Sequence, residues 1–274
     1  MSKPEPDPGQ PLIARLVHRS VLVEGPGPSP VLKLMFNVEP GGRRFEPGTD
    51  VGFAPPGQAA GSGLRHYTVD AIGEVPFEDS IDLTLHVRDH ASPGSVAGML
   101  AALGQGDEVA LYGPFAYPFY APMGSRSNMV LIGAGCGMVP FRWLARKVQS
   151  RRLDWMGKVL MLHGERTGLE RLYQNDPDRD RDQFFDMASY RAFEALKTRY
   201  SAAALDSTES IERNMDALWR LLGQGSVFVY LAGYRGAAAA LDQAMSEHLR
   251  LSGRWLDAKA ELVKGGHWLE HLYD

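Results

Sequence analysis

Three glycines follow a short apolar run in the middle of the chain. The run 129–132 precedes Gly133, Gly135 and Gly137, and Pro140 then opens a helical pattern of apolar residues. Glycine lets the backbone approach a ligand closely, and proline suits the first turn of a helix. The unpaired N–H groups at a helix start suit a phosphate. We predict a strand, a tight loop and a helix. The loop is either a phosphate site or only a turn, because Pro140 stands where a GxGxxG fingerprint has its third glycine.

A second group with chemical potential is Arg65-His66-Tyr67-Thr68. In a strand, residues two apart share a face, so Arg65 and Tyr67 point the same way. An arginine fork binds phosphate oxygens, and an aromatic ring stacks on a flat heterocycle. Taken alone, the pair is equally well a surface arginine beside a core tyrosine.

Three further segments have plain structural interpretations when each is taken alone. The segment 106–115 reads GDEVALYGPF, a turn, a strand and another turn. The segment 227–233 reads VFVYLAG, a strand that ends in a glycine. The aromatic segment 267–274, HWLEHLYD, is typical of a terminus docked onto a core.

The first half of the chain must position Arg65 and its neighbours. Its short runs are separated by glycine and proline, which indicates a closed antiparallel barrel with one helix at 95–103. The run 81–88 alternates apolar and polar residues, as a half-buried strand does. The predicted strands are 12–22, 31–38, 66–72, 81–88 and 108–111.

The second half must position the glycine loop. Continuous apolar runs alternate there with helical patterns, which predicts a parallel sheet covered by helices on both faces. The predicted domains are a disordered tail at 1–11, a barrel at 12–124 and an α/β domain at 125–274. The predicted strands are 129–132, 159–162 and 227–231, and the predicted helices are 141–150, 191–199, 211–222 and 237–251.

Composition sets limits on the class of protein. The chain has 274 residues, 44% hydrophobic and 23% charged residues, and a formal net charge of −4, so no basic field favours nucleic acid. No apolar run approaches the ~20 residues of a membrane span. Cys136 is the only cysteine, which excludes an internal disulfide and an iron–sulfur cluster held by four cysteines of this chain. We expect a cytoplasmic monomer without a metal site.

The order of these five motifs resembles the ferredoxin–NADP(+) reductase family, in its plant-type branch, over residues 12–273. The resemblance implies an FAD-binding barrel and an NAD(P)H-binding α/β domain. The implied reaction passes electrons between NADP(H) or NAD(H) and a separate one-electron carrier, by hydride transfer to flavin N5. Ferredoxin, flavodoxin or the iron–sulfur component of an oxygenase would be the carrier. Two alternatives are a reductase of free flavin or another small acceptor, and a flavin-binding electron-transfer subunit without nicotinamide turnover.

The same resemblance assigns roles on the FAD side. It implies that Arg65 binds the pyrophosphate, that Tyr67 stacks on the flavin ring and that Thr68 lies near flavin N5. His66 belongs to this cofactor motif. Tyr273 would cover the other face of the flavin.

Two more segments are matched to the FAD phosphates. Arg88 resembles a basic residue close to them. The phosphate-binding GxxS segment of the family falls on Gly94-Ser95-Val96-Ala97, where Ala97 replaces the serine. Backbone N–H groups and Ser95 remain as donors.

On the nicotinamide side, Gly133, Gly135, Gly137 and Pro140 form the dinucleotide loop, and Gly233 ends the facing strand. Ala232 stands where the family usually has a cysteine, and Cys136 stands where threonine is usual. A thiol has therefore either moved across the pocket or is only a small loop residue.

The acid–base and phosphate residues also depart from the family pattern. His271 replaces a glutamate tied to proton handling, so it is either a titrating group or a surface histidine, and Glu270 is the adjacent substitute. The segment 200–207 has no arginine for a 2′-phosphate, which leaves Arg166 and Arg199 as candidate ligands and NADPH and NADH both open. A basic run at 142–152 docks an acidic partner or is simply a solvated helix face.

Overall fold

The computed structural model describes residues 9–23, 30–58, 63–89, 94–116, 119–123, 126–150, 157–164, 215–216, 218–250 and 252–273. Contacts divide the chain into two compact units, Met1–Tyr117 and Pro118–Asp274. The predicted division after residue 124 falls within the second unit. The predicted helix 191–199 lies outside the described residues.

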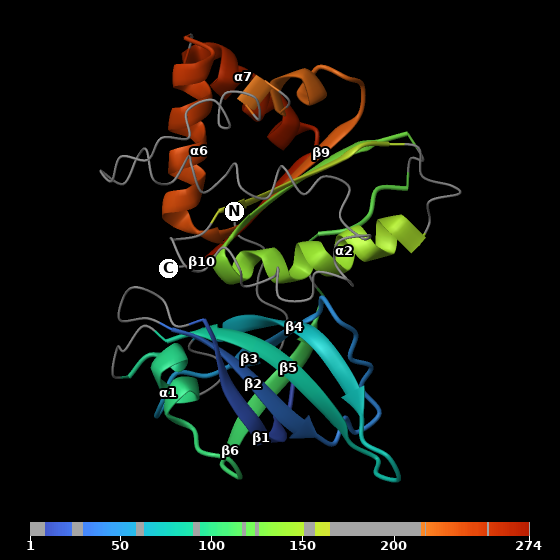
Figure 1. Ribbon diagram of the computed structural model, residues 1–274, viewed down its shortest axis with the longest axis vertical. Coiled ribbons are helices and arrows are strands. Elements are labelled where there is room, and N and C mark those ends of the chain that lie inside the picture. The colour runs from blue at the N-terminus through green and yellow to red at the C-terminus, as the bar shows by residue number, and fades with distance from the viewer. Residues whose placement is uncertain are drawn as a thin grey trace. The chain divides into compact units, whose positions relative to one another are not determined.

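The first unit is a closed antiparallel barrel, as predicted (Figure 1). The order of strands around it is β1-β2-β5-β4-β3-β6, and β6 pairs with β1 to close it. Closure leaves no unpaired strand edge. The strands are β1 (Leu12–Val23), β2 (Val31–Val38), β3 (Asp50–Phe53), β4 (Arg65–Glu74), β5 (Ile81–Arg88) and β6 (Glu108–Phe115), and the α-helix among the described residues of this unit is α1 (Val96–Ala102).

Alternation of side chains fills the barrel. On β5, Leu83, Leu85 and Val87 point into a core that they share with Leu34 and Phe36 of β2. The other face of β5 is buried as well, at Thr84 and His86, so the expectation of a half-buried strand is wrong there. Burial on both faces from Leu83 to Val87 restricts the choice of side chain at these five positions of the strand.

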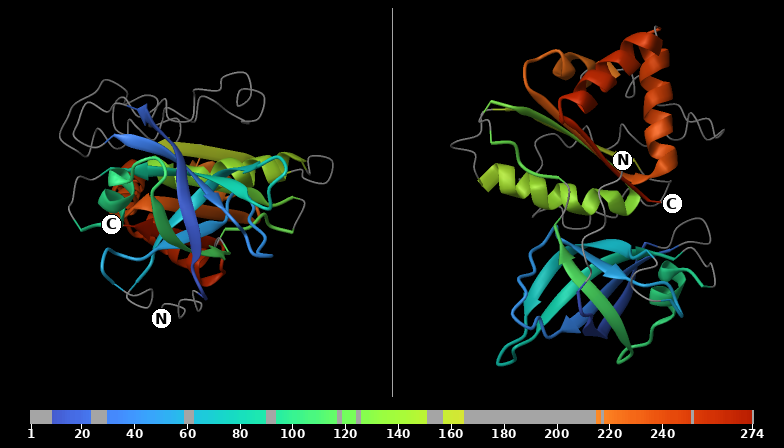
Figure 2. Two further views of the ribbon diagram at one scale, coloured as in Figure 1. Left: turned by 90° about the horizontal axis from the view of Figure 1, so that it is seen from below. Right: turned by 180° about the vertical axis from the view of Figure 1, so that it is seen from behind.

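The second unit is a four-stranded parallel sheet in the order β10-β9-β7-β8, with helices on both faces, as predicted. Figures 1 and 2 show α2 on one face of the sheet and α6 and α7 on the other. The elements are β7 (Asn128–Ala134), a 3-10 turn η2 (Gly135–Met138), α2 (Val139–Ser150), β8 (Val159–Gly164), β9 (Val227–Tyr234), α6 (Arg235–His248), α7 (Ser252–Lys264) and β10 (Trp268–Tyr273).

One hydrophobic core of the second unit lies between the sheet and α6 and α7. Trp255, Leu241 and Met245 of these helices pack against Val229 and Leu231 of β9. Trp255 is fully buried, and its ring meets the ring of Trp268 edge to face at 5.8 Å. An aromatic pair of this geometry contributes about 0.5–1.5 kcal/mol beyond its buried area. The aromatic C-terminal segment is thus a strand of the sheet.

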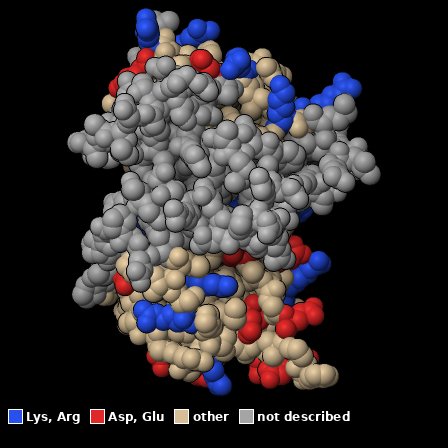
Figure 3. Space-filling view, in the orientation of Figure 1, with Lys and Arg blue, Asp and Glu red and all other residues tan. Residues whose placement is uncertain are grey.

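None of the helices among the described residues has the length and apolarity of a membrane span. The same residues contain no group of three or more His, Cys, Asp or Glu placed to hold a metal ion. Charged side chains of both signs are spread over the described surface of the barrel (Figure 3).

Candidate functional site

The start of β4 carries the predicted FAD motif. Arg65 pairs in register with Phe53 and Tyr67 with Val51, so Arg65 and Tyr67 share one face of the strand. Arg65 is exposed, whereas the half-buried ring of Tyr67 meets the ring of Phe53 at 5.8 Å, edge to face. The site therefore presents an exposed guanidinium on the same face of β4 as an aromatic ring that packs against the barrel core.

Thr68 lies on the opposite face of β4 and is bonded to a residue that the sequence did not single out. Its Oγ1 donates to Oδ1 of Asp50 on β3 at 2.7 Å. Asp50 is 3% exposed, and burial raises the pKa of its carboxyl to about 7, although the hydrogen bond from Thr68 opposes that shift. Only the register of β3 against β4 brings these two residues together, and β3 is too short for its pattern to reveal that register.

His66 continues this outer face, where β3 and β6 leave little room. Its ring lies 4.8 Å from the ring of Phe115. A Cβ atom on Gly52 would stand 2.9 Å from Cδ1 of Leu64 and 3.2 Å from the Phe115 ring. Gly52 therefore permits the close packing that surrounds the Asp50 and Thr68 pair.

The predicted phosphate segment begins helix α1. Gly94 has a φ of 86°, in the left-handed region, and Ser95 is the N-cap, whose hydroxyl accepts from the Gly98 N–H at 3.0 Å. Val96 and Ala97 pack against the barrel core. The serine hydroxyl thus already has a capping role, and the described backbone of this turn is fixed by it. Arg88 is half-buried at the end of β5.

The glycine loop has the predicted order of strand, turn and helix. β7 ends at Ala134, η2 covers Gly135–Met138, and Pro140 lies in the first turn of α2. A Cβ atom on Gly133 would stand 2.8 Å from Cα of Met138, and one on Gly137 would stand 2.7 Å from the backbone nitrogen of Gly233. Internal packing therefore requires Gly133 and Gly137 before any ligand is considered.

The ends of three parallel strands meet beside this loop. Gly133 of β7 is in register with Ala232 of β9, and Ala232 is in register with His271 of β10. Because Gly137 packs against the backbone of Ala232, the loop that contains Cys136 adjoins the same row. Cys136 is half-buried and forms no disulfide. Cys136 and Ala232, the two positions predicted to depart from the family pattern, thus lie in one region of the fold.

Gly233 and Tyr273 complete the residues predicted at this edge. Gly233 has a φ of 141°, and a Cβ atom there would stand 2.6 Å from Cβ of Ala134. Tyr273 pairs in register with Tyr234 at the end of β10. Arg166 and Arg199, the candidate phosphate ligands, lie outside the described residues, as does the segment 200–207.

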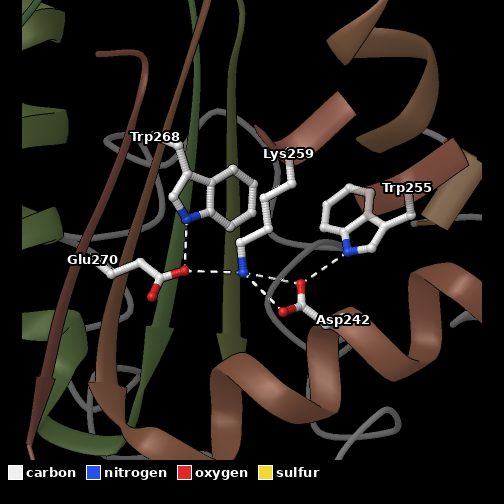
Figure 4. Close-up of polar contacts among 5 residues, drawn as sticks. All are labelled: Asp242, Trp255, Lys259, Trp268 and Glu270. Atoms are coloured by element: carbon white, nitrogen blue, oxygen red, sulfur yellow. Dashed lines mark hydrogen bonds and ion pairs between the residues drawn. The ribbon is translucent and has the colours of Figure 1, made fainter. Parts of the chain in front are cut away.

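Glu270 belongs to a polar network on the α7 side of β10 (Figure 4). Its Oε1 accepts from the indole N–H of Trp268 at 2.7 Å and lies 3.1 Å from Nζ of Lys259. Lys259 also contacts both carboxylate oxygens of Asp242, at 2.8 and 3.0 Å, and Asp242 accepts from the indole N–H of Trp255 at 2.8 Å. Alternation along the strand puts His271 on the other face from Glu270.

A hollow of about 1500 Å³ lies elsewhere on the barrel, at the ends of β1, β2 and β5. Its charged lining is mostly acidic, which disfavours a phosphate group. The acidic lining comprises Glu39, Glu74, Glu78, Asp79 and Glu108.

The predicted basic run is only partly described. Lys147 is exposed and lies 4.6 Å over the ring of Trp143, while Arg151 and Arg152 fall outside the described residues.

Comparison of sequences identifies relatives over nearly the whole chain, although no family model matches it. The ferredoxin–NADP reductase of Synechocystis sp. is 23% identical, with 97% of this chain and 68% of the relative covered. That of Spirulina sp. is 25% identical, with 97% and 96% covered. The predicted resemblance to the ferredoxin–NADP reductase family is confirmed. A chloroplast leaf isozyme of rice with the same name is 22% identical over 97% of this chain and 78% of its own length.

Solved structures of ferredoxin–NADP reductase share the fold. The enzyme of Plasmodium falciparum with 2′P-AMP superposes with a TM-score of 0.60 at 15% identity, with 97% of this chain and 98% of that chain covered. The cytochrome P450 reductase of Amycolatopsis has a TM-score of 0.56 at 19% identity, with 96% and 69% covered. Both the barrel and the parallel sheet are therefore arranged within each unit as in known reductases.

Proposed function

We propose that the protein is an FAD-dependent NAD(P)H oxidoreductase that passes electrons between NAD(P)H and a separate one-electron carrier. The observation that carries this proposal is the extent of the similarity, because the ferredoxin–NADP reductases align over 97% of the chain and thus over both units. The predicted cofactor motif of the barrel and the glycine loop of the sheet are both present in the chain. The predicted cytoplasmic location and monomeric state stay predictions.

The residues at the start of β4 have the chemistry to hold FAD. The exposed guanidinium of Arg65 suits a pyrophosphate, and the ring of Tyr67 offers a flat apolar surface that the barrel core fixes. Thr68 offers a hydroxyl at the same strand, and Arg88 a second positive charge. The capped turn at Gly94 and Ser95 would contribute backbone N–H groups. When bound, the flavin would accept hydride at its N5 and release electrons singly.

The nicotinamide dinucleotide is assigned to the edge formed by β7, β9 and β10. Gly135 and Cys136 in η2, Pro140 in α2, and Ala232 and Gly233 at the end of β9 are the residues proposed to line it. Tyr273, at the end of β10, is proposed to cover the flavin until the nicotinamide replaces it.

We propose that the protein uses NADP(H) in preference to NAD(H). The relatives are named NADP reductases, and one solved neighbour binds 2′P-AMP, a fragment that carries the 2′-phosphate. The absence of arginine at 200–207 argues for NADH instead, and Arg166 is the proposed substitute ligand.

The electron acceptor is proposed to be a ferredoxin, with flavodoxin or an oxygenase component as the other carriers. A carrier in trans is required because the chain has one cysteine and so no four-cysteine cluster of its own. The basic residues of α2 suit an acidic carrier, since opposite charges accelerate encounter.

The test begins with purified full-length protein, whose flavin is identified after release by heat. Anaerobic bleaching of the flavin by NADPH and by NADH is then followed, and electron transfer from the reduced flavin is measured with oxidised ferredoxin and with free FMN. Bleaching by NADPH and fast transfer to ferredoxin are expected. A protein that takes up no FAD overturns the proposal. Transfer to FMN alone supports the small-acceptor reductase, and FAD that no nicotinamide bleaches supports the electron-transfer subunit.

A further inference from the structure

We propose that Asp50 is a positioning residue of the proposed flavin site: its charge sets whether the Thr68 hydroxyl donates or accepts a hydrogen bond toward a bound ligand. The inference rests on the proposed function for the identity of that ligand. It rests on the structure for the link between the two side chains.

The first support is the geometry of the link. Oγ1 of Thr68 and Oδ1 of Asp50 are 2.7 Å apart, and the two residues are directly paired in register across β3 and β4. Backbone pairing fixes both Cα positions, so the contact does not depend on a flexible loop. A hydrogen bond to a carboxylate at this distance is a strong, charge-assisted one.

The second support is the burial of the carboxyl. Asp50 is 3% exposed, and burial raises its pKa to about 7, so the group changes charge near neutral pH. An ordinary surface aspartate stays ionised throughout that range. A buried carboxyl with this pKa is available in both protonation states at the pH at which a reductase works.

Protonation reverses the polarity of the Thr68 hydroxyl. A hydroxyl has one hydrogen and two lone pairs. When Asp50 is ionised, that hydrogen is held by Oδ1, and Thr68 can only accept from a ligand. When Asp50 is protonated, the carboxyl can donate to Oγ1, and the Thr68 hydrogen is released toward a ligand acceptor. A flavin ring presents acceptor nitrogens when oxidised and an additional N–H donor when reduced, so the two states of Asp50 favour different redox states.

Other titratable and charged side chains lie on the strands that pair with β3 and in the segment before it. His86 of β5 lies beside Asp70 of β4, with Nε2 and Oδ2 3.7 Å apart. Burial raises the pKa of the Asp50 carboxyl, and the hydrogen bond from Thr68 lowers it. The charged and titratable side chains of the strands that pair with β3 are Arg65, His66, Tyr67, Asp70 and Glu74 on β4 and Glu108 and Tyr112 on β6. Arg43, Arg44 and Glu46 precede β3, and Arg43 donates to the Gly113 carbonyl.

The link is tested first in FAD-free, full-length protein. The aspartate ¹³Cγ shift is followed by NMR between about pH 4 and 9, and the Asp50 signal is assigned by its loss in Asp50→Asn. In Thr68→Val, the midpoint of this titration is expected to rise by about one pH unit, because a donor to the ionised form is lost. In Thr68→Ser, which keeps the hydroxyl, the midpoint should stay within a few tenths of a unit. Equal midpoints in wild type and Thr68→Val would overturn the link.

The consequence for a ligand is tested in FAD-loaded protein. The midpoint potential of the flavin is measured by spectroelectrochemistry across the same pH range in wild type and in Asp50→Asn. A break in the plot of potential against pH at the Asp50 midpoint, present in wild type and absent in the variant, supports the proposal. Parallel plots overturn it. A protein that takes up no FAD overturns the proposed function and the flavin-directed part of this inference, while the NMR titrations still decide whether Asp50 and Thr68 are coupled.

Discussion

Nζ of Lys259 on helix α7 lies 3.1 Å from Oε1 of Glu270 on the C-terminal strand β10. The Lys259 ammonium is 17% exposed and sits 4.8 Å over the ring of Trp268. The same ammonium binds Asp242 of α6, so one cation joins two helices and the edge strand that carries His271 and Tyr273. The position of this strand therefore depends on charge as well as on packing.

Replacement of the ammonium tests how much this junction stabilises the second unit. Lys259→Met keeps the apolar stem over Trp268 but leaves two partly buried carboxylates without their cation. We expect a loss of roughly 1–3 kcal/mol in the free energy of unfolding, less than for a fully buried pair because Asp242 and Glu270 are partly exposed. Urea unfolding at neutral pH measures it. Lys264→Met, on the same helix and 80% exposed, is the control and should change stability by less than about 0.5 kcal/mol.

Glu270 is expected to act through stability and not in proton transfer. Its carboxylate is bound by Trp268 and Lys259 on the α7 side of β10. Glu270→Gln should therefore lower the unfolding free energy, while the rate of flavin bleaching by NADPH stays within about threefold of wild type across pH. Stopped-flow absorbance measures that rate. A pH profile that loses a limb in Glu270→Gln would show that the carboxylate handles a proton.

The sequence predicted the elements whose patterns are long and regular. The bounds of β2 and β5 were predicted as they stand. Alternation of apolar and polar residues marks β5, and β2 is apolar except at Lys33 and Asn37. β3 was missed because its four residues include a glycine and an aspartate, which interrupt any pattern. α7 was missed as well, and Arg250, with a φ of 52° in the left-handed region, separates it from α6.

The polar partners in the structure were beyond the reach of the sequence. Thr68 and Arg65 were predicted from the motif, whereas Asp50 became a candidate only through the register of β3 against β4. Asp242 and Glu270 are 28 positions apart, and Lys259 unites them only after α6, α7 and β10 have packed. The glycine loop was predicted correctly as strand, turn and helix, but the structure gives Gly133 and Gly137 a packing role that no spacing revealed.

Gly137→Ala should disturb the loop without any ligand present. The added Cβ would meet the backbone of Ala232 and Gly233, which cannot move as a flexible side chain can. Overpacking of this kind costs about 1–3 kcal/mol of unfolding free energy. Gly253→Ala is the matched control, because that glycine is exposed in α7 with no atom within 4 Å of the added carbon. The control should be neutral or stabilising by up to about 1 kcal/mol. Equal stability of the two variants would contradict the tight packing.

Arg65→Ala tests the proposed pyrophosphate ligand. Arg65 is exposed, so its removal should leave the barrel stable, while the loss of a charge-assisted contact should weaken FAD binding by roughly 10–100-fold. Fluorescence titration of FAD into the apoprotein measures the Kd. Arg44→Ala removes another exposed arginine of the barrel, one that pairs with Glu46, and should leave the Kd unchanged. A Kd that is the same in Arg65→Ala and wild type would remove Arg65 from the site.

The stability of Asp50→Asn relative to wild type should be greater at high pH than at low pH. The pKa of the carboxyl is about 7 in the folded state and 3.8 when unfolded, so the folded state binds the proton more tightly. Stability from this group is therefore present at acidic pH and is lost as pH rises from about 4 to 7. The variant lacks this loss. Its unfolding free energy relative to wild type should increase by roughly 2–4 kcal/mol between about pH 4 and 8.

Urea unfolding at both pH values measures this difference. Asp50→Ser also lacks the titrating group but keeps an acceptor for the Thr68 hydroxyl, so it should show the same increase with pH. A difference between wild type and either variant that is constant with pH would mean that the carboxyl is ionised in both the folded and the unfolded protein, because only a change in proton uptake makes stability depend on pH. The buried Asp50 beside Thr68 would then hold a fixed negative charge.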